Sequence, residues 1–546
     1  MERNLGALDR QFDVLVVGGG IYGACVARLA AAQGLSVALL ERGDFGGAVS
    51  HNSLKTVHGG FRYIQHFDLP RIWESVAAQR AWLHAAPHLV KPMRFVIPAY
   101  GHGTRGPLVF AAGIAAYQVA ALRRNAGLKG RSRLPMPGLL SRRALIGQYP
   151  ALARADLTGG AYWYDAQMLD ANRLGLECLQ DACDHGAVVA NHIEVLQLRS
   201  TGAAVDGVVA RDRISGRELE VRAAVTVNAT GSSVERLLRA GPRPMTVGKP
   251  LVWTRNVNIV VPRVFDGDSA VGVGSRQASD AKLGASKRLF FVAPWQDCSI
   301  IGTSHIRHQG DLDDIGSDVD RDVAAFLDEV GEALPASRIS HADVRYVHSG
   351  LTPAEDDTVR AKRGTIIDHE RADGVRGLIT VLGIKYTTAP TVAAGVMPIV
   401  RRLLDRQYHV HRISAFSRPL PGSVGFSSTG AREEPDASDR VWAERIYGAR
   451  APQMLAMLPA AGLSADEHVF RCRVLYGIRN EMVVRLRDAI FRASDLAERG
   501  ALTAAQLEWC AAEMAAAYGW SAQRRRAEIE EVVSKVRLQP RADQAA

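Results

Sequence analysis

The 546-residue sequence has no hydrophobic run long enough to cross a membrane as a helix. Its longest weakly polar segment, residues 108–122 (LVFAAGIAAYQVAAL), is shorter than the roughly 20 residues that a spanning helix needs, and it contains Gln118. The N-terminus also lacks the order of charged, apolar and small residues that marks a signal peptide, because a polar lead runs directly into an apolar segment. These absences predict a cytoplasmic protein.

Cysteine is scarce and scattered. The six cysteines form no C-x-x-C pair and have no histidine at metal-ligand spacing, so we expect buried free thiols and no metal site. Hydrophobic residues make up 47% of the chain and charged residues 23%, which is the composition of a globular protein rather than of a disordered or fibrous one. The length predicts two or three domains.

Acidic residues are fewer than basic residues, and the net charge is +10. A positive surplus suits an anionic substrate or a membrane surface, and we expect no nucleic-acid partner. One interpretation places segment 108–122 on an anionic bilayer as a peripheral contact at the inner face of the cytoplasmic membrane; the alternative is a core helix with a solvated basic end. The basic residues that follow this segment are Arg123, Arg124, Lys129, Arg131 and Arg133.

The start of the chain has the pattern of a βαβ unit. Residues 12–18 (FDVLVVG) are apolar and β-branched, as is typical of a buried parallel strand. A small-residue helix follows up to Gly34, where a left-handed cap is expected, and a second strand ends at Glu41. In the middle of the chain, RLFFVAPW and CSIIGTS predict an antiparallel pair of strands.

The C-terminal part has a different pattern. Apolar periodicity disappears over residues 417–439, whereas residues 440–537 have helical spacing throughout. We therefore predict a mixed α/β domain over residues 1–416, a linker over 417–439 and an all-helical domain over 440–546.

Gly18, Gly20 and Gly23 form a G-x-G-x-x-G motif between the first strand and the helix. Gly18 allows the tight turn, Gly20 lets a pyrophosphate approach the backbone, and Gly23 lets helix and strand pack closely. The helix N-terminus offers N–H groups to the phosphates, and Glu41 would accept hydrogen bonds from the ribose hydroxyls. The motif in this context predicts a dinucleotide site.

The segment after Glu41 distinguishes FAD from NAD. A nicotinamide domain would continue with a second mononucleotide half, whereas here a polar, glycine-rich segment follows, which favours FAD. The 382–388 segment, LGIKYTT, would aim helix N–H groups at the flavin. The other residues expected along the extended cofactor are Ser50, Ser53, Lys55, Ala229, Thr230, Gly231, Gly383, Lys385, Thr387 and Thr388.

Several segments together resemble the FAD-dependent, quinone-linked glycerol-3-phosphate dehydrogenases over nearly the whole chain. The segments are GGGIYGACVARLAAAQGLSVALLERGDF, SLKTVHGGFRYI, APHLVKPMRFVIP, FFVAPW with SIIGTS, GLITVLGIKYTT and YGIRNEMVVRLRDAIFR. The resemblance implies a Rossmann-like FAD-binding domain (about 11–65, 185–240 and 370–405) with an antiparallel-sheet substrate domain (about 66–184 and 241–369). It also implies oxidation of a secondary alcohol, hydride transfer to flavin N5 and electron transfer to a quinone.

By this resemblance the VHGGFRYI stretch supplies catalytic side chains. His58 is expected as a base or a hydrogen-bond donor at the flavin, Arg62 as an anion clamp and Tyr63 as a hydrogen-bonding group for the substrate, with Lys385 facing them. Structural roles are the alternative: His58 could bond the backbone of the glycine turn, Arg62 could form an ion pair, and Tyr63 could be a packed ring.

The chain also departs from the family at the substrate pocket. Thr352 and Ile367 replace two family arginines, Ile384 replaces a glycine, and RNVN at 255–258 replaces K-G-S-H. Two lost guanidiniums remove charge-assisted bonds to phosphate, of order 1.5–3 kcal/mol each, so we favour a related polyol or polyol phosphate over glycerol 3-phosphate as substrate. Arg255, Arg360, Lys362 or Arg363 could restore anion binding. The full set of expected substrate contacts is Arg62, Tyr63, Arg255, Asn258, Thr352 and Lys385.

Two other functions stay open. Arg62 could clamp a carboxylate, which would suit the oxidation of a 2-hydroxy acid or an amine. A flavin-binding protein without turnover is the other alternative. The electron acceptor, a homodimer and a covalent flavin link are left open as well.

Overall fold

The computed structural model describes residues 1–101, 106–241, 243–278, 287–312, 319–354, 364–405, 418–426 and 439–536. The side chain of Arg62 lies outside this description, as do Arg360, Lys362 and Arg363. Most of the expected linker lies outside it too, so the domain limits stay a prediction. Within the described residues, no helix combines the length and apolar character needed to cross a membrane.

The first sheet is built around β1 (Gln11–Val17), which runs parallel to β2 (Val37–Leu40) and β10 (Glu218–Asn228) on either side. The strand order is β16-β17-β10-β1-β2-β7, and β9 pairs antiparallel with β10 and with β8. All residues of β2 are buried, as expected for a parallel strand covered on both faces. The other strands are β7 (Val188–Ala190), β8 (Ile193–Thr201), β9 (Ala204–Asp212), β16 (Thr365–Asp368) and β17 (Leu378–Leu382).

Helices cover both faces of this sheet. Val14 and Val16 face α1 (Ile21–Ala32), α5 (Ala171–Asp184) and α9 (Ala389–Leu403), whereas the alternate residues of β1 face a second apolar cluster beneath α6 (Val234–Arg239). The left-handed conformation predicted for Gly34, after the end of α1, is present with φ +80°.

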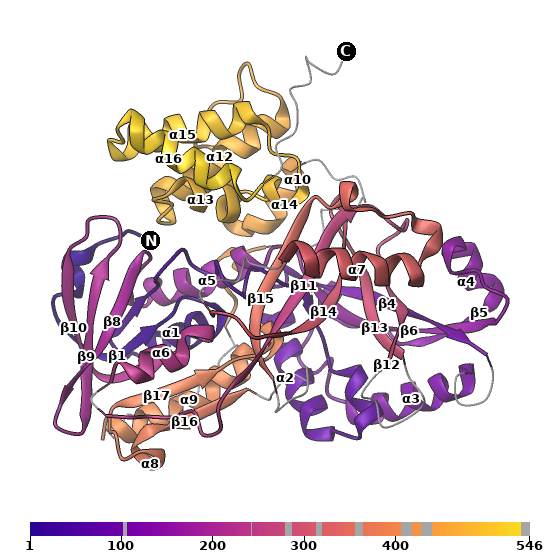
Figure 1. Ribbon diagram of the computed structural model, residues 1–546, viewed down its shortest axis with the longest axis horizontal. Helices are drawn as coiled ribbons and strands as arrows, with labels where there is room; N and C mark the ends of the chain where they lie inside the picture. The colour runs from indigo at the N-terminus through magenta and orange to yellow at the C-terminus, as the bar shows by residue number, and fades with distance from the viewer. Residues whose placement is uncertain are drawn as a thin grey trace.

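The second sheet is mostly antiparallel, in the order β15-β11-β14-β13-β12-β4-β6-β3, with β5 beside β6. The predicted antiparallel pair is confirmed, because Trp295 of β13 lies opposite Cys298 of β14. Helix α7 (Val319–Ala333) covers one face (Figure 1). The strands are β3 (Thr56–Val57), β4 (Val90–Tyr100), β5 (Gly138–Ser141), β6 (Leu157–Met168), β11 (Val252–Pro262), β12 (Ala270–Ala278), β13 (Lys287–Trp295), β14 (Cys298–His308) and β15 (Tyr346–Ala354).

Among the described residues, four further α-helices lie around the sheets. Two of them, α2 and α3, are neighbours beside the second sheet (Figure 1). The four are α2 (Leu69–Ala85), α3 (Pro107–Ala120), α4 (Arg142–Gln148) and α8 (His369–Ala372).

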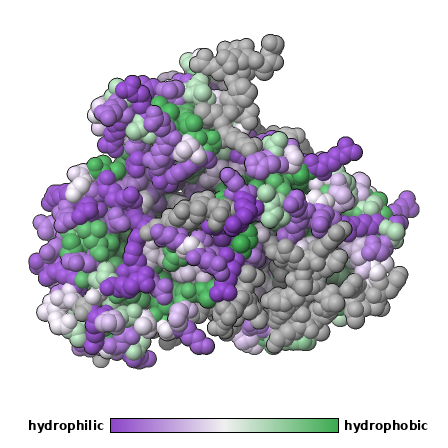
Figure 2. Space-filling view, in the orientation of Figure 1, coloured by the Kyte–Doolittle hydropathy of each residue, from purple (hydrophilic) through white to green (hydrophobic). Residues whose placement is uncertain are grey.

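The described C-terminal residues, 439–536, form a separate group of helices above the two sheets (Figure 1). Its outer surface is mainly hydrophilic in the view of Figure 2. The mixed α/β fold with a C-terminal helical domain, predicted from the sequence, is therefore confirmed. The helices are α10 (Asp439–Tyr447), α11 (Ala451–Leu455), α12 (Ala465–Asn480), α13 (Leu486–Asp488), a π-helical turn (Ala489–Ala493), α14 (Leu496–Arg499), α15 (Ala504–Tyr518) and α16 (Ala522–Val533).

Buried ion pairs hold the C-terminal helices on the sheets. Arg173 of α5 makes a bidentate pair with Glu481, with one of the two contacts at 3.0 Å. His192 Nε2 lies 2.9 Å from Asp488 Oδ2. Burial alone would raise the pKa of Glu481, but Arg173 outweighs this effect and lowers it. The pKa of Asp488 is likewise lowered, because His192 and Arg492 outweigh burial.

These shifts predict acid lability. A carboxyl group whose folded pKa lies below its unfolded value, about 4, contributes stability that is present above that value and is lost as pH falls through the folded pKa. We expect the free energy of unfolding in urea to fall as pH drops below about 5. Glu481→Gln should lose about 3–5 kcal/mol at pH 7 and depend less on pH.

The control is Glu218→Gln, which removes an exposed carboxylate paired with Arg211. This change should cost less than about 1 kcal/mol and leave the pH dependence as it is in the wild type. Equal pH dependence for Glu481→Gln and the wild type would contradict the assignment of acid lability to this ion pair.

Candidate active site

A cavity of about 930 Å³ lies between the two sheets and is lined by residues of both. Its volume is at the upper end of the range of about 300–1,000 Å³ that is usual for ligand pockets. The carboxyl ends of β1 and β10 and the glycine loop form one end. β11, β14 and β15 of the second sheet form another wall. One continuous cavity is therefore available to both the cofactor and the substrate.

The glycine loop is packed too tightly for side chains. A Cβ on Gly18 would lie 2.5 Å from the carbonyl oxygen of Ala229, and its φ is +107°. A Cβ on Gly23 would lie 1.9 Å from the carbonyl oxygen of Gly18. Gly20 borders the cavity, where a Cβ would approach Ser50 Oγ at 3.2 Å. The roles predicted for these glycines, a turn, a close approach and helix–strand packing, agree with this geometry.

Two side chains fix the glycine loop from the cavity side. Glu41 accepts hydrogen bonds from the N–H groups of Gly19 at 2.6 Å and Gly43 at 2.7 Å, and burial raises its pKa. Ser50 Oγ accepts a hydrogen bond from the first N–H of α1, Ile21 N, at 2.9 Å. Both residues line the cavity, so each can contact a bound nucleotide.

Most of the other predicted cofactor residues also line the cavity. Gly23 and Thr388 do not line it and pack behind it instead. Lys55 does not line it either, because its ammonium is buried against Glu498 at 2.8 Å. The lining members are Gly18, Gly20, Glu41, Ser50, Ser53, Ala229, Thr230, Gly231, Gly383, Lys385 and Thr387.

Tyr22 fixes the backbone of the 382–388 segment. The N–H groups of Ile384 and Lys385 both donate to the hydroxyl of Tyr22, at 3.1 and 3.2 Å. The Tyr22 hydroxyl in turn donates to the carbonyl of Lys385 at 2.8 Å. A Cβ on Gly383 would lie 2.1 Å from the Tyr22 ring, so glycine is required there. Tyr22 was not predicted as a site residue, although it stands inside the G-x-G-x-x-G motif.

Three of the four predicted catalytic residues lie in the cavity together. His58 follows β3, and its N–H donates to Thr387 Oγ1 at 3.2 Å. The rings of His58 and Tyr63 are 6.2 Å apart, and the ammonium of Lys385 lies 4.1 Å from the centre of the Tyr63 ring. All three line the cavity. Arg62 lies in the 3₁₀ helix Phe61–His66, but its side chain is outside the described residues.

Asp165 positions the glycine pair next to His58. This buried residue of β6 accepts hydrogen bonds from Gly59 N at 2.5 Å, Gln79 Nε2 at 2.8 Å and Trp163 Nε1 at 3.0 Å. Burial raises its pKa, and these three donors oppose the change. Asp165 was not predicted from the sequence, although a single acidic residue within the otherwise apolar and aromatic strand GGAYWYDAQM could have indicated a polar contact.

The wall from the second sheet carries amide, imidazole and hydroxyl groups. Asn256 Nδ2 donates to Thr352 Oγ1 at 2.7 Å, and Asn256 Oδ1 lies 2.5 Å from His305 Nδ1. Thr303 Oγ1 donates to Asn258 Oδ1 at 2.8 Å. These five residues line the cavity, and Asn256, Thr303 and His305 were not predicted from the sequence.

Arg255 and Ile367 lie away from this wall. Because side chains alternate along β11, Arg255 points to the opposite face from Asn256, where its Nη1 donates to Asp322 Oδ2 at 2.7 Å. Ile367 packs against the apolar cluster of the first sheet and does not line the cavity. Of the two positions at which the sequence predicts the loss of a family arginine, the structure brings only Thr352 to the cavity.

Comparisons with known proteins agree with this architecture. A family model described as FAD dependent oxidoreductase matches residues 13–396. The chain belongs to this family of FAD-dependent oxidoreductases. A second model, the C-terminal domain of alpha-glycerophosphate oxidase, matches residues 420–525. The resemblance seen in the sequence is therefore confirmed, and the cofactor of the family is FAD.

Two relatives and one solved structure that resemble this chain carry the same name. Glycerol-3-phosphate dehydrogenase of Synechocystis is 28% identical over 89% of this chain and 89% of its own length. A Mycobacterium leprae protein with the same name is 34% identical over 70% of this chain, but the match covers 62% of its length. An X-ray structure of glycerol-3-phosphate dehydrogenase from Bacillus halodurans, complexed with FAD, has a TM-score of 0.73 at 22% identity, covering 97% of this chain and 96% of that chain. The chain is thus an FAD-dependent oxidoreductase of the glycerol-3-phosphate dehydrogenase type.

The residues of the cavity fit this cofactor. The glycine loop leaves a backbone cradle that any Cβ at Gly20 would narrow, and Glu41 and Ser50 stand on either side of it. We infer that these residues hold the ADP half and that the 383–387 segment borders the flavin, next to His58.

This assignment predicts the behaviour of Gly20→Val. The added side chain would occupy the space in which a pyrophosphate approaches the backbone, so the purified protein should be colourless and should not regain flavin absorbance with added FAD. The control is Gly147→Val, since Gly147 is exposed and a Cβ there meets no atom within 4 Å. Full flavin occupancy in Gly20→Val would contradict the glycine-loop assignment.

Proposed function

We propose that the protein oxidises a secondary alcohol of a polyol or polyol phosphate to a ketone. The observation that carries this proposal is the grouping of His58, Tyr63 and Lys385 at one cavity with the glycine loop. The names of the relatives support an alcohol substrate of the glycerol phosphate type.

The side chains suit the proton part of this reaction. Oxidation removes a hydride from carbon and a proton from oxygen, and bound FAD supplies the hydride acceptor. His58 would take the hydroxyl proton, because its ring lines the cavity beside Tyr63. Lys385 would stabilise the negative charge that develops on the substrate oxygen as this proton leaves. Tyr63 would hydrogen-bond the substrate.

The second-sheet wall favours a hydroxyl group over a phosphate. A guanidinium at position 352 could make two charge-assisted bonds to a phosphate, whereas the hydroxyl of Thr352 has one proton to donate. Asn256 and His305 extend the same hydrogen-bonded group. We therefore propose that this end of the pocket binds an uncharged, hydroxyl-bearing part of the substrate.

Substrate choice can be tested with anaerobic flavin reduction by a panel of polyols and their phosphate esters. The wild type should be reduced faster by a neutral polyol than by glycerol 3-phosphate. Thr352→Arg should raise kcat/KM for glycerol 3-phosphate about tenfold or more, because a hydrogen bond to a charged group contributes about 1.5–3 kcal/mol.

Thr201→Arg is the matched control, since it adds the same charge at an exposed position on β8 away from the cavity. Efficient wild-type turnover of glycerol 3-phosphate would contradict the altered pocket. Reduction by a 2-hydroxy acid or an amine alone would favour that alternative chemistry, and no reduction by any compound would favour a binding protein.

We also propose that the protein works at the cytoplasmic face of a membrane and passes electrons to a quinone. Large apolar side chains are exposed on neighbouring elements: Trp73 of α2 is 56% exposed, Val119 of α3 69% and Leu122 80%. Arg124, expected to be solvated, is buried and donates to Pro135, but Arg123, Lys129, Arg131 and Arg133 are exposed. Apolar groups with basic neighbours suit an anionic bilayer, and the six free cysteines suit a reducing compartment.

Vesicle binding tests the membrane proposal. Trp73→Ser combined with Leu122→Ser should weaken co-sedimentation with anionic vesicles by about 100-fold or more, since burying each side chain contributes about 1.5–3 kcal/mol. The control pair, Val441→Ser with Val533→Ser, changes exposed apolar residues of the C-terminal helices and should have no effect. Equal binding of all three proteins would contradict the proposal.

A further inference from the structure

The loop that borders the cavity after the glycine motif has two sides. Ser50, Asn52 and Ser53 line the cavity, whereas His51 and Lys55, from the same loop, are turned away from it and buried. The buried side of the loop meets α14 of the C-terminal helices. A part of the chain that does not touch the cavity thus contacts the loop that forms its wall.

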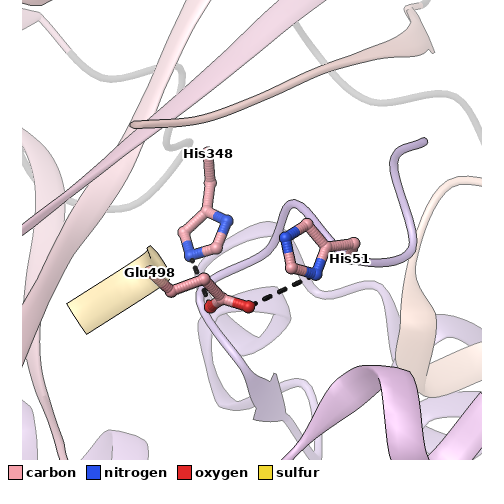
Figure 3. Close-up of side chains that lie close together, drawn as sticks. All are labelled: His51, His348 and Glu498. Carbon is pink, nitrogen blue, oxygen red and sulfur yellow. Dashed lines mark ion pairs between the residues drawn. The ribbon is translucent and has the colours of Figure 1, made fainter. Parts of the chain in front are cut away.

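Glu498 of α14 is the centre of this contact. Its Oε2 lies 2.8 Å from Lys55 Nζ and 3.4 Å from His348 Nε2, and its Oε1 lies 3.4 Å from His51 Nδ1. Figure 3 shows both imidazoles directed at the carboxylate, one from the loop and one from β15. The side chains of all four residues are at most 5% exposed. We call these four residues the Glu498 clasp.

The Glu498 clasp contains one buried negative charge, on Glu498, and one buried positive charge, on Lys55. Burial alone would raise the pKa of Glu498, but Lys55 and the histidines outweigh it and lower the pKa. Burial lowers the pKa of His51 to about 4 against the opposing effect of Glu498, and it also lowers the pKa of His348. Near neutral pH both imidazoles are therefore uncharged, and Lys55 balances the carboxylate.

Two histidines and a carboxylate could also hold a metal ion, but the contacts favour an ion pair. The amide nitrogen of Asn172 donates to the carbonyl of Phe491 at 2.9 Å, which fixes it as a donor toward His51 Nδ1 at 2.7 Å. The lone pair of that ring nitrogen is thus engaged. The ammonium of Lys55 already stands beside Glu498 Oε2, where a metal would have to bind.

We propose that Glu498 is a positioning residue for the cofactor loop, through which FAD binding and docking of the C-terminal helices stabilise each other. The ion pair with Glu498 holds Lys55 on the rear of the loop, and the hydrogen bond from Asn172 holds His51 there, so that Ser50 and Ser53 stay at the cavity. Because linkage is reciprocal, whatever the clasp contributes to FAD affinity, bound FAD contributes to the docking of α14. This coupling does not depend on which substrate the protein oxidises.

The first test is the dissociation constant of FAD, measured by titration of the apoprotein. Glu498→Gln should raise it by about 5- to 150-fold, the usual range for coupling between two sites. Glu508→Gln is the matched control, since Glu508 is an exposed residue of α15 whose partner is Arg525; its dissociation constant should equal that of the wild type. An unchanged value for folded Glu498→Gln would overturn the proposal.

A double variant separates positioning from stability. Removing one partner of a buried pair leaves an uncompensated charge, so Glu498→Gln or Lys55→Met alone could unfold the protein. Lys55→Met combined with Glu498→Gln removes both charges and should regain a Tm near that of the wild type, yet FAD binding should stay weak because the loop is no longer held. Wild-type FAD affinity in the double variant would overturn the proposal.

Amide hydrogen exchange tests whether bound FAD in turn stabilises the docking of α14. Adding FAD to the wild-type apoprotein should slow exchange in α14 and the residues that follow it, and this response should be lost in the double variant. The same response to FAD in both proteins, or none in the wild type, would overturn the proposal.

Discussion

The close contact between the glycine loop and the ends of β1 and β10 is the constraint on which the rest of the cavity depends. Because Gly18 and Gly23 have no side chains, the loop can pack directly against Ala229 and the start of α1. Glu41 and Ser50 can then reach the loop, and Tyr22, within the same motif, fastens the 383–387 segment to it. The close contact of the glycine loop with the strand ends therefore sets the relative positions of three walls of the cavity.

The strands and the helix around this contact could be predicted because residues close in the sequence determine them. A buried parallel strand, a glycine turn and a small-residue helix can each be recognised from neighbouring residues, and so could the βαβ unit that they form. Lys55 and Arg255 could not be placed in this way. Their charges are neutralised by Glu498 and Asp322, which are distant in the sequence, and a single sequence does not show which distant charges meet.

The substrate wall illustrates a second limit. The sequence identified β11 as important through RNVN, but the direction of each side chain depends on the pairing of β11 with β14 and β15. That pairing turns Asn256 and Asn258 into the cavity and Arg255 away from it. The resemblance predicted that arginines are missing at Thr352 and Ile367, and of these two positions the fold brings only Thr352 to the cavity.

The ion pairs beneath the C-terminal helices also affect when the charged residues of the cofactor loop can be buried during synthesis. Asp44 leaves the ribosome 448 residues before its partner Arg492, and Lys55 similarly precedes Glu498. Burying either charge without its partner would cost several kcal/mol, so both stay hydrated while the chain is incomplete. We therefore expect a nascent chain that has not reached Arg492 to keep water behind the cofactor loop, and cofactor capture to be a late step of biogenesis.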